Sequence, residues 1–337
     1  MLFQDMELYN VAELGPAGPY GQRPLLRVPW EVARHLNPSA QQFNLCNCGV
    51  ELRFNLLQDT VRIRMCTNES GKFARQYVYF GDTCAPWAEC VKTVGSEPTE
   101  IVIHRPDFSR LEKRAAAVNS GWDPHLVRLI LLNASTSLLD VRGKVSPPRP
   151  GQTPNKKILF YGSSITHGSL ALSQVDTYPF LTAENLGMDQ INLGYAGSAW
   201  LEPEMADYIA GRTDADLVVL ELGINLLPVL TAEQFGARVK DFVGRIARAR
   251  PATPIFCTDL FYCESDLCRD GQAAAFRAAL RQALRDLAAP NVVHMDGCTL
   301  LTGPAGLSAD LVHPNVHGAR QIAENLCRVI RGNLDLR

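Results

Sequence analysis

After residue 155 the sequence alternates between short apolar runs and longer amphipathic stretches. Five runs have the character of buried strands, at residues 158–161, 191–193, 217–222, 255–258 and 292–295. Helix-like stretches alternate with them, near residues 178–186, 202–210, 232–249, 272–288 and 316–330. This alternation predicts a parallel sheet with helices on both faces, the three-layer α/β/α class. Ligands of such sheets bind beyond the carboxyl ends of the strands.

The part of the chain before residue 146 has a different pattern. Short β-branched or aromatic runs occupy residues 48–56, 60–66, 75–80, 100–104 and 126–132, with Asn, Gly, Asp and Pro between them. Such spacing predicts an antiparallel, jelly-roll-like β-sandwich. Residues 146–154 contain four prolines, which neither a helix nor a central strand tolerates. We therefore predict a sandwich domain at 1–145, a linker at 146–155 and an α/β domain at 156–337.

Composition excludes several classes of function. The 337 residues carry a net charge of −2, so nothing draws the chain as a whole to nucleic acid or to acidic membranes. No secretory signal or membrane-spanning run is visible, which predicts a cytoplasmic protein. The ten cysteines lack the spacing of a zinc site, and we expect mostly free thiols, with a structural disulfide left open. No motif for a metal, a phosphate or another cofactor occurs.

Polar or glycine-rich motifs follow three of the predicted strands and precede the last helix. Residues 162–168 (GSSITHG) form a strand-to-loop turn of small residues, which suits an exposed serine nucleophile. Gly197 and Asn225 follow the second and third strands, where a backbone N–H and a side-chain NH2 can face a developing oxyanion. Asp310 precedes His313 by three residues, close enough to bind Nδ1–H and leave Nε2 as a general base.

Each motif alone is also typical of an ordinary turn or cap. Together, in this order, they resemble the four blocks of the SGNH (GDSL) family of esterases and acyl hydrolases, over about residues 155–331. The resemblance implies a triad of Ser164, Asp310 and His313, and an oxyanion hole formed by Ser164, Gly197 and Asn225. The departure is Ser163, which stands where the family usually has Asp.

Residues 162–168, 191–197, 201–207 and 222–225 resemble, more narrowly, a branch of this family with an N-terminal β-sandwich. That branch includes carbohydrate-ester hydrolases and an acyltransferase of antibiotic biosynthesis. The resemblance implies a serine esterase that cleaves a short O-acyl ester of a carbohydrate or similar small molecule. The alternatives are an acyltransferase acting on a sugar or natural-product hydroxyl and, less favoured, a non-catalytic carbohydrate-binding protein.

Four further residues are candidates for the wall of a substrate pocket. His167 follows the nucleophile but has no acidic partner nearby in the sequence, which favours a loop or wall position over a second base. Tyr195 and Trp200 are suited to an acyl or sugar pocket, although buried aromatic residues need no function. Cys263 follows the fourth strand without a partner base, so we expect a wall position rather than a nucleophile. The sequence leaves the oligomeric state open.

Overall fold

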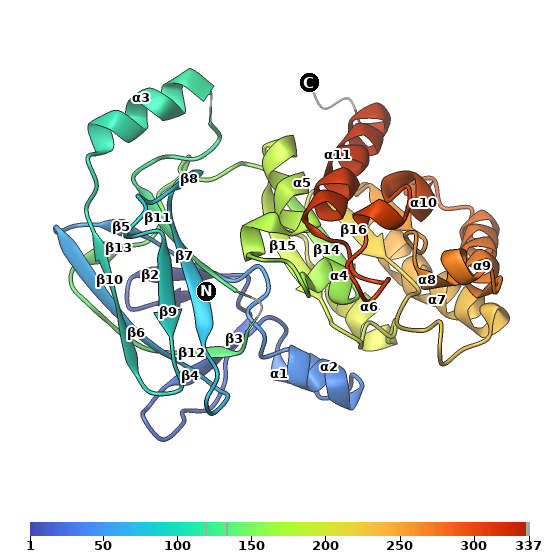
Figure 1. The fold of residues 1–337 in the computed structure, drawn as a ribbon, viewed down its shortest axis with the longest axis horizontal. Coiled ribbons are helices and arrows are strands. Elements are labelled where there is room, and N and C mark those ends of the chain that lie inside the picture. Colours follow the sequence, from blue (N-terminus) through green and yellow to red (C-terminus); the bar gives the residue numbers. More distant parts are fainter. Residues whose placement is uncertain (119, 133, 335–337) are drawn as a thin grey trace. The chain divides into compact units, whose positions relative to one another are not determined.

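The computed structural model describes residues 1–118, 120–132 and 134–334, which form two units of different architecture (Figure 1). The first unit comprises residues 1–30 and 44–155. The second comprises residues 31–43 and the chain from residue 156 onward. Residues 31–43, which hold most of α1 (Trp30–Ala33) and all of α2 (Pro38–Phe43), therefore leave the first unit and join the second. The pattern of the sequence had predicted that these residues belong to the sandwich domain at 1–145.

The first unit consists of antiparallel sheets, as predicted. One sheet has the order β1 (Leu2–Phe3), β2 (Met6–Tyr9), β5 (Glu51–Leu56), β11 (Leu126–Leu131), β7 (Ala74–Phe80) and β8 (Thr83–Cys84), with β13 (Val145–Ser146) pairing with β5 and β9 (Val91–Val94) with β7. Another has the order β10 (Thr99–His104), β6 (Thr60–Thr67), β12 (Thr136–Arg142), β4 (Arg23–Leu26) and β3 (Glu13–Leu14). Leu52 and Phe54 of β5 and Ile63 and Met65 of β6 share one apolar core, so the sheets pack face to face.

The proline-rich segment, predicted as a linker, packs on the first unit. It begins in β13, which pairs with β5. The Asn55 side chain of β5 donates to the carbonyl of Pro147 at 2.9 Å and exchanges hydrogen bonds with Gln152. Proline cannot donate to a ladder, but the Pro147 carbonyl accepts, and this bond together with the Asn55–Gln152 pair fixes the segment.

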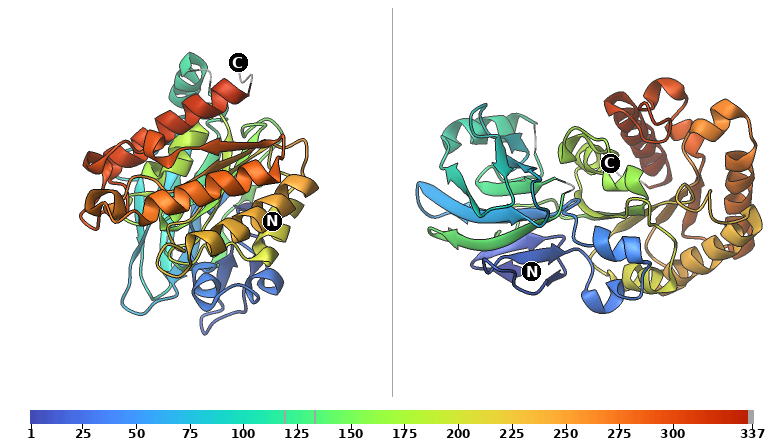
Figure 2. Two further views of the ribbon diagram at one scale, coloured as in Figure 1. Left: turned by 90° about the vertical axis from the view of Figure 1, so that its right-hand side faces the viewer. Right: turned by 60° about the horizontal axis from the view of Figure 1, so that its bottom comes forward.

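The second unit is built on a parallel sheet, as predicted. The strands have the order β15 (Asp189–Gly194), β14 (Lys157–Gly162), β16 (Leu217–Glu221), β17 (Ile255–Thr258) and β18 (Val292–Met295). The packed pair α5 (Tyr178–Leu186) and α11 (Val316–Asn333) covers one face, and α6 (Pro203–Gly211), α7 (Ala232–Ala249) and α9 (Gln272–Leu287) pack in sequence on the other. Figure 2 gives two further views of these layers.

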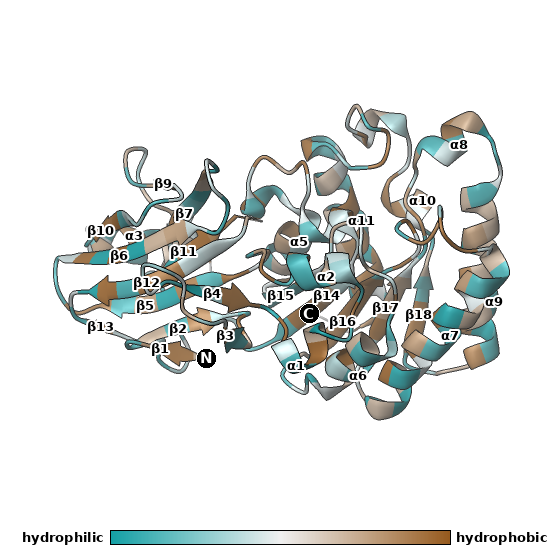
Figure 3. Cartoon of the chain, turned by 90° about the horizontal axis from the view of Figure 1, so that it is seen from below, coloured by the Kyte–Doolittle hydropathy of each residue, from teal (hydrophilic) through white to brown (hydrophobic). Residues whose placement is uncertain are grey.

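Both faces of the parallel sheet are buried, which explains its nearly continuous apolar strands. Adjacent residues of β14 point to opposite faces. Phe160 meets Tyr178 of α5 edge-on at 5.8 Å between ring centroids, whereas Tyr161 stacks on Phe242 of α7 at 5.1 Å. The covering helices show hydrophobic and hydrophilic segments in alternation in Figure 3, as expected where one side faces a sheet. Among the described residues, no helix is both long and apolar enough to cross a membrane.

The strand order places the carboxyl end of β14 at the point where the direction of the chain across the sheet reverses. From β14 the chain goes first to β15 on one side and then to β16 on the other. In doubly wound sheets the loops diverge at this switch point and leave a crevice for ligands. The loops after β14, β15 and β16 therefore meet at one edge of the sheet, and these are the loops that carry Ser164, Gly197 and Asn225.

Candidate active site

Ser164 begins the short helix α4 (Ser164–His167) directly after β14. Ser163 caps this helix, because its hydroxyl accepts the N–H of Ile165 at 3.1 Å. Gly168 ends the helix in the left-handed conformation, with φ of 93°. Ser164 is 8% exposed, so its hydroxyl sits at the sheet edge largely shielded from solvent. From the sequence a loop was predicted here, because four residues are too few to show a helical period.

Two glycines let α4 approach the sheet. A Cβ on Gly194, the last residue of β15, would overlap the backbone of His167. A Cβ on Gly162 would overlap the side chains of Thr166 and Glu221. The side chain of Asn192 donates to the Thr166 carbonyl at 2.8 Å and ties the helix to β15. The turn that carries Ser164 thus packs so closely against β15 and Glu221 that a side chain at either glycine would not fit.

Ser164, His313 and Asp310 form one chain of hydrogen bonds. His313 Nε2 lies 2.7 Å from Ser164 Oγ, and His313 Nδ1 lies 2.7 Å from Asp310 Oδ2. The other carboxylate oxygen accepts the N–H groups of Val312 and His313 at 3.0 and 2.9 Å. With Nδ1 donating to the carboxylate, Nε2 is the nitrogen that accepts the serine proton. The structure therefore brings together all three predicted triad residues.

The turn between Asp310 and His313 keeps the carboxylate charged. Burial alone would raise the pKa of Asp310, but hydrogen bonds from the backbone of His313 and Val312 and from the imidazole hold the pKa below its ordinary value. Leu311 lies between them with φ of 58°, a left-handed conformation that non-glycine residues adopt at some cost. That conformation closes the turn in which one carboxylate can reach both the backbone and the ring.

Gly197 and Asn225 lie on adjoining loops, after β15 and β16. Gly197 has φ of 64°, which glycine adopts without strain. Asn225 Oδ1 accepts the N–H of Ala199 at 3.1 Å, which leaves the NH2 end of the amide to donate elsewhere. Within the described ranges, no residue accepts a hydrogen bond from the N–H of Ser164, the N–H of Gly197 or the NH2 of Asn225. These are the three donors that the sequence analysis assigned to an oxyanion hole.

Glu221 is a residue of this site that the sequence analysis missed. Its Oε2 accepts the backbone N–H and the hydroxyl of Ser163, each at 2.6 Å, and the hydroxyl of Thr166 at 3.1 Å. It is 2% exposed, and burial raises its pKa, an effect that the hydrogen bonds from Ser163 only partly offset. The available signal was a single acid inside the apolar strand 217–222, which needs a partner when buried.

His167, Tyr195 and Trp200 were predicted to line a pocket, and each has structural contacts. His167 is buried at the end of α4, where its ring meets Phe43 edge-on at 5.6 Å. Tyr195 is buried, and its N–H donates to the Gly162 carbonyl at 2.8 Å. Trp200 is half-buried and its carbonyl accepts from Arg238 at 3.0 Å. Their role toward a substrate stays a prediction.

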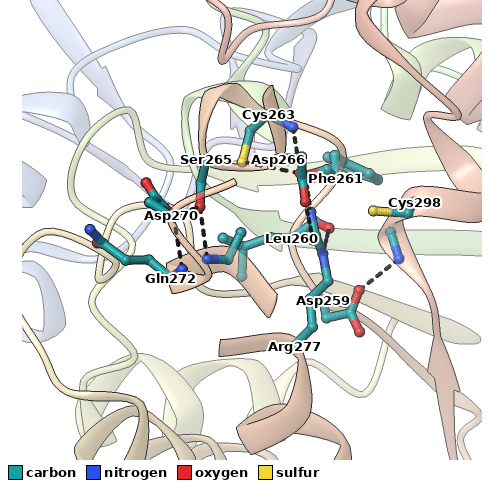
Figure 4. A network of polar contacts seen from close by, with 12 residues as sticks. Asp259, Leu260, Phe261, Cys263, Ser265, Asp266, Asp270, Gln272, Arg277 and Cys298 are labelled. Atoms are coloured by element: carbon teal, nitrogen blue, oxygen red, sulfur yellow. Dashed lines mark hydrogen bonds and ion pairs between the residues drawn. The ribbon is translucent and has the colours of Figure 1, made fainter. Parts of the chain in front are cut away.

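Cys263 belongs to a polar network at the start of α8 (Glu264–Cys268), drawn in Figure 4. Its N–H donates to Asp266 at 3.0 Å, and its sulfur lies 3.7 Å from the same carboxylate oxygen. Arg277 pairs with Asp266 at 2.6 and 2.7 Å. Burial, and next the charge of Asp266, raise the pKa of the Cys263 thiol. A raised pKa lowers the fraction of thiolate, which is the nucleophilic form of cysteine. The wall position of Cys263 stays a prediction.

Comparison with known proteins adds a family and a set of related folds. Residues 155–331 match the model of a GDSL-like lipase/acylhydrolase family.

A salicylyl-acyltransferase from a tetracycline biosynthetic pathway superposes with a TM-score of 0.78 at 22% identity, over 99% of this chain and 96% of that one. A family two carbohydrate esterase from Cellvibrio japonicus gives 0.66 at 13% identity, over 99% and 96%. An acetyl xylan esterase from the rumen bacterium Butyrivibrio proteoclasticus gives 0.60 at 13%, over 100% and 98%. No curated protein sequence matches the chain. At identities this low, the structural similarity shows a shared fold and nothing further.

Proposed function

Because this chain belongs to the GDSL-like lipase/acylhydrolase family, we propose that it is a serine esterase that works through an acyl-enzyme intermediate. The observation that carries the proposal is the hydrogen-bonded chain from Ser164 Oγ through His313 to Asp310. A serine activated in this way attacks an ester carbonyl, and the site has donors for the oxyanion that results. No step requires a metal or another cofactor.

In the first half-reaction His313 Nε2 takes the hydroxyl proton of Ser164 as Oγ attacks the carbonyl carbon. Asp310 holds the ring in the required tautomer and stabilises the imidazolium. The N–H groups of Ser164 and Gly197 and the NH2 of Asn225 donate to the oxyanion. The tetrahedral intermediate collapses as His313 returns the proton to the leaving alkoxide. In the second half-reaction His313 deprotonates water, which attacks the acyl-enzyme and regenerates Ser164.

The substrate class we propose is a short O-acyl ester, such as an acetyl ester, of a carbohydrate or a similar small alcohol. Two structures that share both units of this fold are described as a family two carbohydrate esterase and an acetyl xylan esterase. They support the sugar-ester assignment, because they cover nearly the whole chain, sandwich included. A non-catalytic carbohydrate-binding function is disfavoured, since a domain that had lost its catalytic function would not retain both the triad and the oxyanion-hole donors around Ser164.

A second candidate function is acyl transfer. The observation that favours it is the similarity to the salicylyl-acyltransferase, with a TM-score of 0.78 over both units. The first half-reaction is unchanged. In the second, a sugar or natural-product hydroxyl replaces water as the group that His313 deprotonates. The choice between the two depends on how well an acceptor alcohol excludes water from the acyl-enzyme.

The experiment compares wild type, Ser164→Ala and Ser109→Ala on p-nitrophenyl acetate. Ser109 is an exposed serine of the first unit, bonded to Asp107, and controls for the loss of a hydroxyl. We expect wild type and Ser109→Ala to turn over the ester and Ser164→Ala to lose nearly all activity with an unchanged Tm. Activity that survives in Ser164→Ala would overturn the assignment. Adding an acceptor alcohol then separates the candidates: acylated acceptor in place of free acetate indicates transfer.

A further inference from the structure

Residues 31–43 belong to the second unit although they precede most strands of the first along the chain. Asn37 stands immediately before α2 and caps it: its Oδ1 accepts the N–H of Ala40 at 3.0 Å, and Pro38 begins the helix. The cap engages the oxygen of the Asn37 side chain. Its NH2 group is therefore turned away from α2.

The NH2 group of Asn37 reaches the loop that follows β15. It donates to the carbonyl of Ser198 at 2.9 Å and to Oε1 of Glu202 at 2.6 Å. The backbone N–H of Asn37 donates to the same Glu202 oxygen at 3.1 Å. Glu202 precedes α6, so α2 is tied to both ends of the connection between Ser198 and α6.

One peptide group of this loop is held from both sides. The Ser198 carbonyl, which Asn37 binds, and the Ala199 N–H, which Asn225 binds, belong to the same peptide. Gly197, the proposed oxyanion donor, is the residue before it. A peptide that is fixed at both its oxygen and its nitrogen cannot rotate. The Gly197–Ser198 peptide before it is held as well, because the Ser198 N–H donates to the Tyr195 carbonyl at 3.2 Å. These hydrogen bonds restrict the backbone on the carboxyl side of Gly197 and so limit the directions in which the Gly197 N–H can point.

The same segment also contacts the helix of the nucleophile. The ring of Phe43, the last residue of α2, meets the ring of His167 edge-on at 5.6 Å between centroids. His167 ends α4, three residues after Ser164. Residues 31–43 therefore touch both the loop of the oxyanion donor and the helix that carries the serine.

We propose that Asn37 is a positioning residue for the oxyanion hole: by binding the Ser198 carbonyl, it fixes the loop that presents the Gly197 N–H. The inference rests on the proposed function, since it gives Asn37 a role in the same acyl-transfer step. Asn37 acts through the loop and touches no reacting atom.

The test uses the full chain and substitutions that separate the two roles of Asn37. Asn37→Ser keeps a capping oxygen for α2 but loses the NH2 group, and Asn37→Asp keeps the cap while placing a carboxylate against Glu202. Combining Asn37→Asp with Glu202→Gln reverses this hydrogen bond, because the new amide at position 202 can donate to the new carboxylate at position 37. The control is Gln41→Ala, because Gln41 Nε2 donates to the Leu36 carbonyl at 2.9 Å and stays within the segment.

We expect kcat on p-nitrophenyl acetate to fall about tenfold or more in Asn37→Ser and further in Asn37→Asp, with KM little changed, because only transition-state stabilisation is lost. The double variant should recover part of the loss, and Gln41→Ala should keep the wild-type kcat. Affinity for a boronic acid, which mimics the tetrahedral intermediate, should fall in parallel with kcat.

Three outcomes would count against the inference, and they are distinguishable. If activity depends on Ser164 but Asn37→Ser and Asn37→Asp retain wild-type kcat, the positioning role is wrong while the proposed function stands. If wild-type activity survives in Ser164→Ala, both fail. A loss of Tm shared by Asn37→Ser and Gln41→Ala, with equal loss of kcat, would assign Asn37 a purely structural role.

Discussion

Ser163 donates both its backbone N–H and its hydroxyl to the same oxygen of Glu221, each at 2.6 Å. The residue before the proposed nucleophile is therefore anchored to a buried acid, which is the last residue of β16. Thr166 adds a third hydrogen bond, and the absence of a side chain at Gly162 leaves the space that the carboxylate fills. The position of Ser164 thus depends on a buried group from a neighbouring strand.

Glu221→Gln should change how stability depends on pH. Burial raises the pKa of Glu221 in the folded state, so between the ordinary and the raised pKa the folded chain holds a proton that the unfolded chain has released. The free energy of unfolding contributed by this group therefore decreases as pH rises through that window. Glutamine stays neutral and can still accept from Ser163. We expect the Tm of the variant relative to wild type to increase as the pH rises above the ordinary pKa of a glutamate, about 4.3.

Thermal unfolding at several pH values checks this expectation. Glu233→Gln, which removes an exposed carboxylate from the first turn of α7, controls for the change in net charge. Parallel curves for wild type and Glu221→Gln across the range would mean that Glu221 is not held protonated by burial.

Asp310→Asn should lower kcat by a factor of about 10³–10⁴ while leaving the fold intact. The amide oxygen can still accept from the backbone of Val312 and His313, which preserves the turn. Its NH2 group would face Nδ1 of His313 and favour the tautomer in which Nε2 carries the proton, so the ring could not accept from Ser164. Steady-state kinetics on p-nitrophenyl acetate measure the loss, and a variant that retained more than a tenth of the activity would remove Asp310 from the triad.

Asn225→Ala should lower kcat by a factor of about 10²–10³, with a smaller change in KM, because it removes one oxyanion donor. It also removes the acceptor for the Ala199 N–H. Asn225→Asp keeps that acceptor but brings a negative charge toward the oxyanion, so its kcat should be no better. Recovery of activity in Asn225→Asp would instead assign Asn225 to holding the loop.

Glu51→Gln should reduce the free energy of unfolding by about 3–5 kcal/mol, because it leaves two buried guanidinium groups without a counter-charge. Glu51 is fully buried between Arg53 at 2.8 Å and Arg128 at 2.6 Å. Although burial alone would raise its pKa, the charges of Arg128 and Arg53 hold the pKa of Glu51 well below its ordinary value. The stabilisation is thus present above the ordinary pKa and lost as pH falls below it.

Urea unfolding of Glu51→Gln and Glu100→Gln tests that loss. Glu100 pairs with Arg62 at 2.6 Å on the surface, where such pairs contribute at most about 1 kcal/mol. Equal effects of the two substitutions would show that the buried group of charges contributes no more than an exposed pair.

The second unit could be predicted from sequence almost element by element. The predicted bounds of α5, α7, β17 and β18 coincide with the observed ones. Local signals set these ends: Thr177 and Thr231 cap the two helices, and Gly187 ends α5 in the left-handed conformation. The family resemblance drawn from the motifs is confirmed by the match over residues 155–331. Several strands of the first unit, such as β12, were missed because their pattern becomes clear only from their neighbours.

The site was predictable where its residues follow strands and not where they act through tertiary contacts. Ser164, Asn225 and the pair Asp310 and His313 lie at element ends, where sequence motifs mark them. Glu221 lies within the apolar run 217–222 that was predicted as a strand, where no motif marks it. Asn37 lies 161 residues from Ser198 in a segment of two short helices. No periodicity indicates which distant loop such a segment will meet.

Because residues 31–43 belong to the second unit, the position of a crossover between two related genes decides whether that unit is inherited whole. A crossover at the proline-rich segment would exchange residues after 155 as one block and leave α2 behind. The hybrid would then join Asn37 of one parent to Ser198 and Glu202 of another. A gene fragment that encodes the whole second unit therefore comprises two separate stretches, and both sides of the α2 contact stay together only when both stretches are inherited.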